Sequence, residues 1–193
     1  GEVHYLKHGY DEDRKFLVCV EDVGITKCPL CGAEEFLFGE VLCDELIEDW
    51  QLNSLETYKI NLQQGFRCKS CSSSLRTMTL GEHITSYYGG GSSLGHLWEE
   101  KSLHSLEINR AGELNQFLKD NSKHVLQEYP EIDLHNVDWP NDSFDVLIHS
   151  DTLEHIPNSH LALTECYRIL KPDGVLFYTI PIIHDRLTIR RDN

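Results

Sequence analysis

The chain has 193 residues, which suits one domain of ordinary size or two small ones. Hydrophobic residues make up 40% and charged residues 25%, a composition that excludes a disordered chain. The formal net charge of -15 argues against a nucleic-acid backbone or an anionic membrane as the main partner, because both are polyanions. No apolar run is long enough for a transmembrane helix, and no signal peptide is visible.

The first half of the chain predicts few regular elements. Residues 15–20 are rich in strand formers and predict a short strand. Residues 42–55 are apolar at helical spacing and predict one helix. The stretch "SYYGGGSSLGH" is too rich in glycine and serine for a regular element. We therefore expect a small module at 1–85, a linker at 86–101 and a second domain at 102–193.

The second half predicts strands that alternate with helices. Helices are expected at 112–120 and 159–171, where apolar residues share one face, and "PDG" ends the second. Strands are expected at 104–109, 123–129, 132–137, 144–150 and 174–183. Such alternation implies βαβ crossovers and a parallel sheet, so the predicted fold class is α/β and Rossmann-like.

Four of the seven cysteines form two CxxC pairs, Cys28 with Cys31 and Cys68 with Cys71. A two-residue spacer lets both thiolates turn onto one ion, and four thiolates suit a tetrahedral structural zinc. We predict a zinc-ribbon-like module with an inserted element, because 36 residues separate the pairs. Four free buried cysteines or a redox CxxC are the alternatives.

The remaining cysteines, at positions 19, 43 and 166, are isolated. An odd count with paired spacing favours metal ligation in a reducing compartment over a disulfide framework. We therefore expect a cytoplasmic protein.

Residues 139–181, "WPNDSFDVLIHSDTLEHIPNSHLALTECYRILKPDGVLFYTIP", resemble the central block of class I S-adenosylmethionine (SAM)-dependent methyltransferases of type 11, the UbiE-like group. The segments "CPLCGA" (28–33) and "RCKSCSSSLR" (67–76) resemble a module that precedes this domain in one subgroup. The resemblance implies SAM as cofactor and methyl transfer to a small-molecule or protein acceptor that the sequence does not identify.

The resemblance also implies a set of cofactor-binding residues. A loop at 109–112 follows the first strand, and only one glycine of the usual GxGxG remains there. An acid after the second strand would hold the ribose hydroxyls, and a later acid the adenine amino group, because carboxylates accept hydrogen bonds well. The expected residues are Glu107, Asn109, Gly112, Glu128, Asp133 and Ser150.

The segment after strand 144–150 would lie under the transferred methyl group. Asp151 and His155 are the weak catalytic candidates within it. His155 could be a general base, or a metal ligand together with Asp151 and Glu154, or it could cap and pack the turn. The packing role is favoured, because the Glu-His pair occurs in methyltransferases with very different substrates.

A complete domain of this kind has seven strands, and five are predicted here, so we expect a truncated or reduced sheet. Its exposed edge favours pairing with another chain, and a homodimer is expected. The alternative function is a non-catalytic Rossmann-like binding module, favoured by the altered loop at 109–112. A nucleic-acid modifier is disfavoured by the charge, since Lys27, Arg67, Lys69 and Arg76 form only a small basic cluster.

Overall fold

The computed structural model describes residues 5–6, 18–19, 23–91 and 93–182. The chain divides into two compact units, with the division between Met78 and Thr79. This division differs from the linker expected at 86–101. No helix within the described residues is long and apolar enough to span a membrane.

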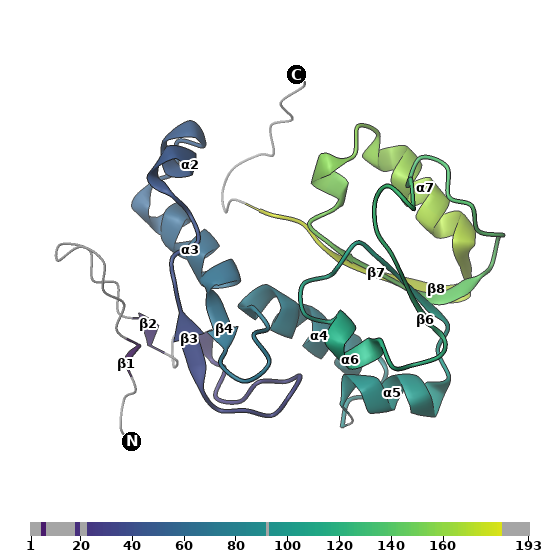
Figure 1. The fold of residues 1–193 in the computed structure, drawn as a ribbon, viewed down its shortest axis with the longest axis horizontal. Helices are drawn as coiled ribbons and strands as arrows, with labels where there is room; N and C mark the ends of the chain where they lie inside the picture. Colours follow the sequence, from purple (N-terminus) through teal and green to yellow (C-terminus); the bar gives the residue numbers. More distant parts are fainter. Residues whose placement is uncertain (1–4, 7–17, 20–22, 92, 183–193) are drawn as a thin grey trace. The chain divides into compact units, whose positions relative to one another are not determined.

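The first unit contains two short antiparallel strand pairs (Figure 1). Strand β1 (Tyr5–Leu6) pairs with β2 (Val18–Cys19), which lies within the strand predicted at 15–20. The rest of that predicted strand lies outside the described residues. Strand β3 (Phe36–Phe38) pairs with β4 (Phe66–Cys68). The rings of Phe36 and Phe66 are buried and stack with centroids 5.0 Å apart.

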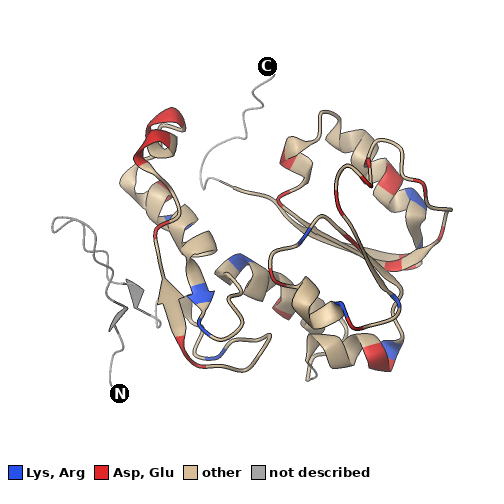
Figure 2. Cartoon of the chain, viewed as in Figure 1, with Lys and Arg blue, Asp and Glu red and all other residues tan. Residues whose placement is uncertain are grey.

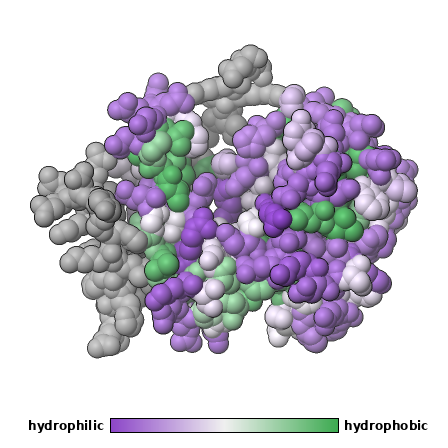
Figure 3. All heavy atoms as spheres, in the orientation of Figure 1, coloured by the Kyte–Doolittle hydropathy of each residue, from purple (hydrophilic) through white to green (hydrophobic). Residues whose placement is uncertain are grey.

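Between β3 and β4 lies a helical arm, made of α2 (Asp44–Asp49) and α3 (Ser54–Gly65). The single helix predicted at 42–55 is therefore wrong. The chain breaks where Gln51 adopts a left-handed φ of 51°, and Asn53 starts α3 with a capping box. Acidic residues cover α2 in Figure 2, and apolar side chains gather on the surface of the arm in Figure 3.

The second unit is built on a four-stranded parallel sheet in the order β6-β5-β7-β8 (Figure 1). These strands confirm the predicted α/β fold with a parallel sheet. Their bounds are β5 Ser105–Ile108, β6 His124–Gln127, β7 Phe144–Ser150 and β8 Leu170–Thr179. The helices are α4 (Leu75–Tyr87, which crosses the division), α5 (Leu94–Lys101), α6 (Asn115–Leu118), the 3-10 turn η1 (Leu153–His155) and α7 (Ser159–Ile169).

Alternate residues of β5 point to the two faces of the sheet. Leu106 and Ile108 belong to the buried cluster that includes Ala162 and Cys166 of α7. Ser105 and Glu107 point to the opposite face, where Trp98 of α5 donates a hydrogen bond to Ser105 Oγ. The second unit is thus a three-layer arrangement, with α7 on one face and α5 and α6 on the other (Figure 1).

Four predicted elements of this unit need correction. The helix expected at 159–171 ends at Ile169, and the "PDG" expected to end it lies within β8. Residues 132–137 form turns and not a strand, although Ile132, Leu134 and Val137 are buried against the sheet. The helix expected at 112–120 is a single turn, α6. The expected linker contains helix α5, because Leu94, Leu97 and Trp98 supply a buried apolar face that periodicity alone left unassigned.

Candidate functional sites

The four paired cysteines converge in the first unit. Their Sγ atoms all lie within 4.8 Å of one another. Cys28 Sγ lies 3.7 Å from Cys71 Sγ, and Cys31 Sγ lies 3.5 Å from Cys68 Sγ. In a tetrahedral zinc site with Zn–S bonds of about 2.3 Å, the sulfur atoms are about 3.8 Å apart. The cluster therefore fits a zinc ion, as the spacing predicted.

Two equivalent backbone turns hold these thiols. The Cys28 N–H donates to Ala33 C=O at 2.7 Å, and Gly32 N–H donates to Cys28 C=O at 2.8 Å. At the second pair, the Cys68 N–H donates to Ser73 C=O and Ser72 N–H to Cys68 C=O, both at 2.9 Å. The residue after each pair is left-handed, with φ of 79° at position 32 and 61° at position 72. The two pairs are thus the same knuckle built twice.

The cluster is partly shielded from water. Cys28 and Cys68 are buried, Cys71 is half-buried and Cys31 is exposed. Burial raises the pKa of the Cys28 thiol to about 12 and also raises the pKa of the Cys71 thiol. Thiolates in such a place need a cation beside them, which a zinc ion would supply.

In the second unit, the strand order changes direction at β5. Strand β6 lies on one side of β5, while β7 and β8 lie on the other. In open α/β sheets, ligands bind beyond the carboxyl ends of the strands at such a switch point. The loops that follow β5, β6 and β7 leave the sheet at this edge. The predicted cofactor and catalytic residues lie in these loops, except Glu107 and Ser150, which lie near the carboxyl ends of β5 and β7.

The loop after β5 replaces most of the usual glycines with side chains that bond locally. Asn109 has a left-handed φ of 54°, and its Oδ1 accepts the Tyr129 N–H at 2.9 Å. Gly112 is also left-handed, with φ of 60°. Arg110 Nε lies 3.2 Å from Glu128 Oε1, and both side chains are substantially exposed. The acid expected to hold the ribose therefore already has a protein partner.

The remaining predicted cofactor residues also have local partners. Glu107 is fully buried, and its Oε1 accepts the Ala111 N–H at 2.8 Å. Asp133 Oδ1 accepts the His135 N–H at 2.8 Å. Ser150 Oγ lies 2.6 Å from Thr179 Oγ1 at the end of β8. The assignment of these residues to cofactor binding stays a prediction.

The catalytic candidates follow β7. Asp151, Glu154 and His155 are exposed, and Asp151 has a left-handed φ of 50°. The His155 N–H donates to Thr152 C=O at 3.1 Å in η1. Within the described parts of the chain, the four cysteines are the one group of three or more Cys, His, Asp or Glu residues placed to hold a metal ion. The role of His155 stays a prediction.

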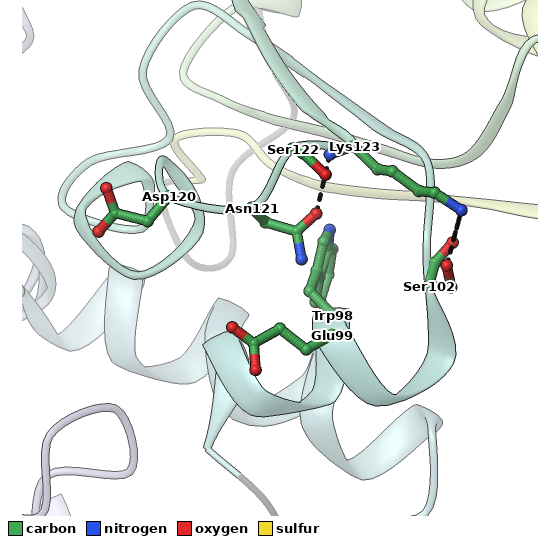
Figure 4. A pocket seen from close by; sticks show the side chains of 7 residues that line it. All are labelled: Trp98, Glu99, Ser102, Asp120, Asn121, Ser122 and Lys123. Atoms are coloured by element: carbon green, nitrogen blue, oxygen red, sulfur yellow. Dashed lines mark hydrogen bonds between the residues drawn. The ribbon is translucent and has the colours of Figure 1, made fainter.

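A hollow of about 280 Å³ lies elsewhere, at the amino-terminal edge of β5 and β6 (Figure 4). Trp98, Glu99, Ser102 and residues 120–123 line this hollow, and Lys123 Nζ lies 2.6 Å from Ser102 Oγ. The sequence did not predict this hollow. Because ligands of open α/β sheets bind at the carboxyl edge, its position does not match a cofactor site.

Residues 88–178 match the family model described as a methyltransferase domain. This match includes most of the segment 139–181 and confirms the resemblance stated from it. None of the curated proteins compared with the sequence matches it.

Several solved structures resemble part of the chain. The YcgJ protein from Bacillus subtilis is 19% identical, with 38% of this chain and 42% of that chain covered and a TM-score of 0.32. A SAM-dependent methyltransferase from Thermotoga maritima is 17% identical, with coverage of 51% and 49% and a TM-score of 0.31. The methyltransferase CalH in complex with SAH is 13% identical, with coverage of 68% and 41% and a TM-score of 0.35. The chain spans less than half the length of each.

Proposed function

We propose that residues 88–178, which match the methyltransferase-domain family, bind SAM at the carboxyl edge of β5, β6 and β7 and transfer its methyl group to an acceptor. The observation that carries this proposal is the switch of strand order at β5, with three loops gathered at that edge. The acceptor is a small molecule or a protein group with a free lone pair.

Methyl transfer from a sulfonium needs little protein chemistry. The cofactor supplies the reactive group, and the protein supplies alignment and exclusion of water. Glu128 would accept hydrogen bonds from the ribose hydroxyls, and Asp133 would accept one from the adenine amino group. The loop at 109–112 would meet the methionine part, and Ser150 begins the segment expected beside the methyl group.

Calorimetric titration of the chain with SAM and with its demethylated product tests the proposal. We expect micromolar binding that Glu128→Ala weakens about ten-fold, because a hydrogen bond to a charged group is worth roughly 1.5–3 kcal/mol. Glu131→Ala is the matched control, since Glu131 is an exposed acid three residues further on. Absence of both heat and a thermal shift with either compound would contradict the proposal.

We also propose that the four-cysteine cluster binds one structural zinc ion. The equivalent knuckles and the sulfur separations support this, and four thiolates leave no open coordination position for catalysis. Metal analysis of the purified chain should give one zinc per molecule. A chain that is folded in its first unit and holds no zinc after purification with zinc present would contradict it.

One observation favours the second candidate function, a non-catalytic binding module. Arg110 forms an ion pair with the Glu128 carboxylate, which the SAM ribose would need. If that contact persists in solution, the cofactor must compete with it. The same calorimetric titration separates the candidates, because only the methyltransferase binds SAM.

A further inference from the structure

A buried chain of hydrogen bonds crosses the helix-covered face of the sheet next to the predicted cofactor edge. Trp98 Nε1 donates to Ser105 Oγ at 2.7 Å. Ser105 Oγ lies 2.9 Å from His124 Nδ1. His124 Nε2 lies 3.1 Å from Glu107 Oε2, and both of these side chains are almost entirely buried. The chain therefore joins helix α5 to the carboxylate at the end of β5.

The chemistry of its members is compatible with one direction along this chain. An indole N–H can only donate, so Ser105 Oγ accepts from Trp98, and its own hydrogen is available for His124 Nδ1. In that arrangement His124 carries its hydrogen on Nε2 and donates it to Glu107. Every polar atom of the chain has a partner in this arrangement, which a buried network requires.

The chain ends on the loop that would meet the cofactor. Glu107 Oε2 also accepts Asn115 Nδ2 at 2.9 Å, and its Oε1 accepts the Ala111 N–H at 2.8 Å. Among the described residues, no lysine or arginine forms an ion pair with Glu107, so N–H donors alone hold this carboxylate. The position of the loop backbone at residue 111 therefore depends on how Glu107 is held.

Strand register explains why His124 can serve this purpose. Parallel pairing places His124 opposite Ser105, and Glu107 lies two residues along β5 on the same face. The imidazole spans the space between them with one nitrogen to each.

We propose that His124 is a positioning residue for SAM binding: it fixes the Glu107 carboxylate, which in turn holds the Ala111 N–H and the loop at 109–112. The inference rests on the proposed function for its ligand. In this proposal His124 contacts Glu107 and does not contact the cofactor itself. Loss of its hydrogen bond would loosen the loop without removing a group that binds SAM.

The test compares three variants of the full chain. His124→Leu should weaken SAM binding about ten-fold in calorimetry, as expected for losing a hydrogen bond to a buried carboxylate. His124→Gln should restore most of it, because its amide can still donate to Glu107. His149→Leu is the matched control, since His149 is a buried histidine of the same sheet without hydrogen-bond partners in the described structure, and should bind like the parent chain.

Hydrogen exchange at the Ala111 amide gives a readout that does not depend on SAM. Exchange should be at least about ten-fold faster in His124→Leu than in the parent chain and in His149→Leu. Unchanged Ala111 exchange or unchanged SAM affinity in a folded His124→Leu chain would overturn the inference. If His124→Leu does not fold, failure of His124→Gln to keep Ala111 protected overturns it instead. In a further outcome, Ala111 exchanges faster in His124→Leu than in the parent chain, but the parent chain does not bind SAM. That result would overturn the proposed function and leave His124 as a structural residue only.

Discussion

Arg110 and Glu128 form an ion pair across the predicted cofactor edge, with Arg110 Nε 3.2 Å from Glu128 Oε1. The pair links the loop after β5 to the end of β6. Both partners are exposed, so the contact contributes at most about 1 kcal/mol. A cofactor ribose that needs the Glu128 carboxylate must displace this contact.

We predict that Arg110→Gln increases SAM affinity by up to about five-fold, because the carboxylate is then free before binding. Calorimetric titration measures the change. Raising the salt concentration should reduce the difference between the variant and the parent chain, since exposed ion pairs are screened. A weaker affinity in Arg110→Gln would mean that Arg110 contacts the ligand directly.

His149 has a buried imidazole with no hydrogen-bond partner in the described part of the chain. Its ring centroid lies 5.2 Å from that of Tyr178. Burial lowers its pKa from 6.5 to about 4. The unfolded chain therefore binds a proton at this histidine before the folded chain does. Stability from His149 is complete above about pH 6.5 and is lost as the pH falls toward 4.

The predicted result is a fall of about 3 kcal/mol in the free energy of unfolding between pH 7 and pH 4 that depends on His149, since one pKa unit corresponds to about 1.4 kcal/mol. His149→Leu should remove this part of the pH dependence. Urea denaturation of both chains across this pH range measures it. Parallel pH profiles for the two chains would show that the imidazole is hydrated or bonded in solution.

The cysteine cluster predicts a clear difference among single substitutions. Cys28→Ser or Cys68→Ser should abolish stoichiometric zinc binding, because a structural site needs all four thiolates. Cys43→Ser should leave the zinc content at the parent value, since Cys43 is exposed and outside the cluster. Native mass spectrometry of the three variants reports the metal directly. Zinc retained by both Cys28→Ser and Cys68→Ser would place the ion elsewhere.

A close backbone contact at the base of the helical arm predicts that alanine substitutions at two glycines have unequal effects on stability. A Cβ added at Gly65 would collide with the Gly39 carbonyl oxygen, whereas a Cβ added at Gly39 would meet nothing. The Gly39 N–H also donates to Gly65 C=O at 3.1 Å, so neither backbone can move away freely. Gly65→Ala should destabilise the first unit by about 3 kcal/mol, and Gly39→Ala by less than about 0.5 kcal/mol.

Hydrogen exchange of the α3 amides checks this prediction, because it reports local stability without assuming that the two units unfold together. Faster exchange is expected in Gly65→Ala alone. Equal protection in both variants would mean that the contact between positions 39 and 65 does not persist in solution.

Sequence patterns predicted the elements whose signals are local. The apolar run of β7 and the helix α7, which Asn158 caps by accepting the Leu161 N–H, follow from neighbouring residues. The cysteine cluster was predictable because each CxxC spacer already dictates its own knuckle. Residues 132–137 misled the prediction because Ile132 and Leu134 alternate as in a strand, while their backbone forms turns.

The polar contacts of the cofactor edge could not be predicted in this way. The partners of Glu107 come from α6 and β6 and from the loop after β5, and their meeting depends on strand register. The Arg110–Glu128 pair likewise joins residues from two loops. Charge alone does not predict which acid an arginine will meet, because an exposed pair has little energy to define it.

The double knuckle also bears on how freely this protein can change in length. The 36 residues between the two CxxC pairs leave the first knuckle and return to the second, so a shared ion would close them into a ring. The entropic free-energy cost of closing such a ring rises by only about 0.6 kcal/mol for each doubling of its length. The helical arm of α2 and α3 can therefore be lengthened, shortened or exchanged at little thermodynamic cost, provided that the close approach of Gly39 and Gly65 at its base is kept.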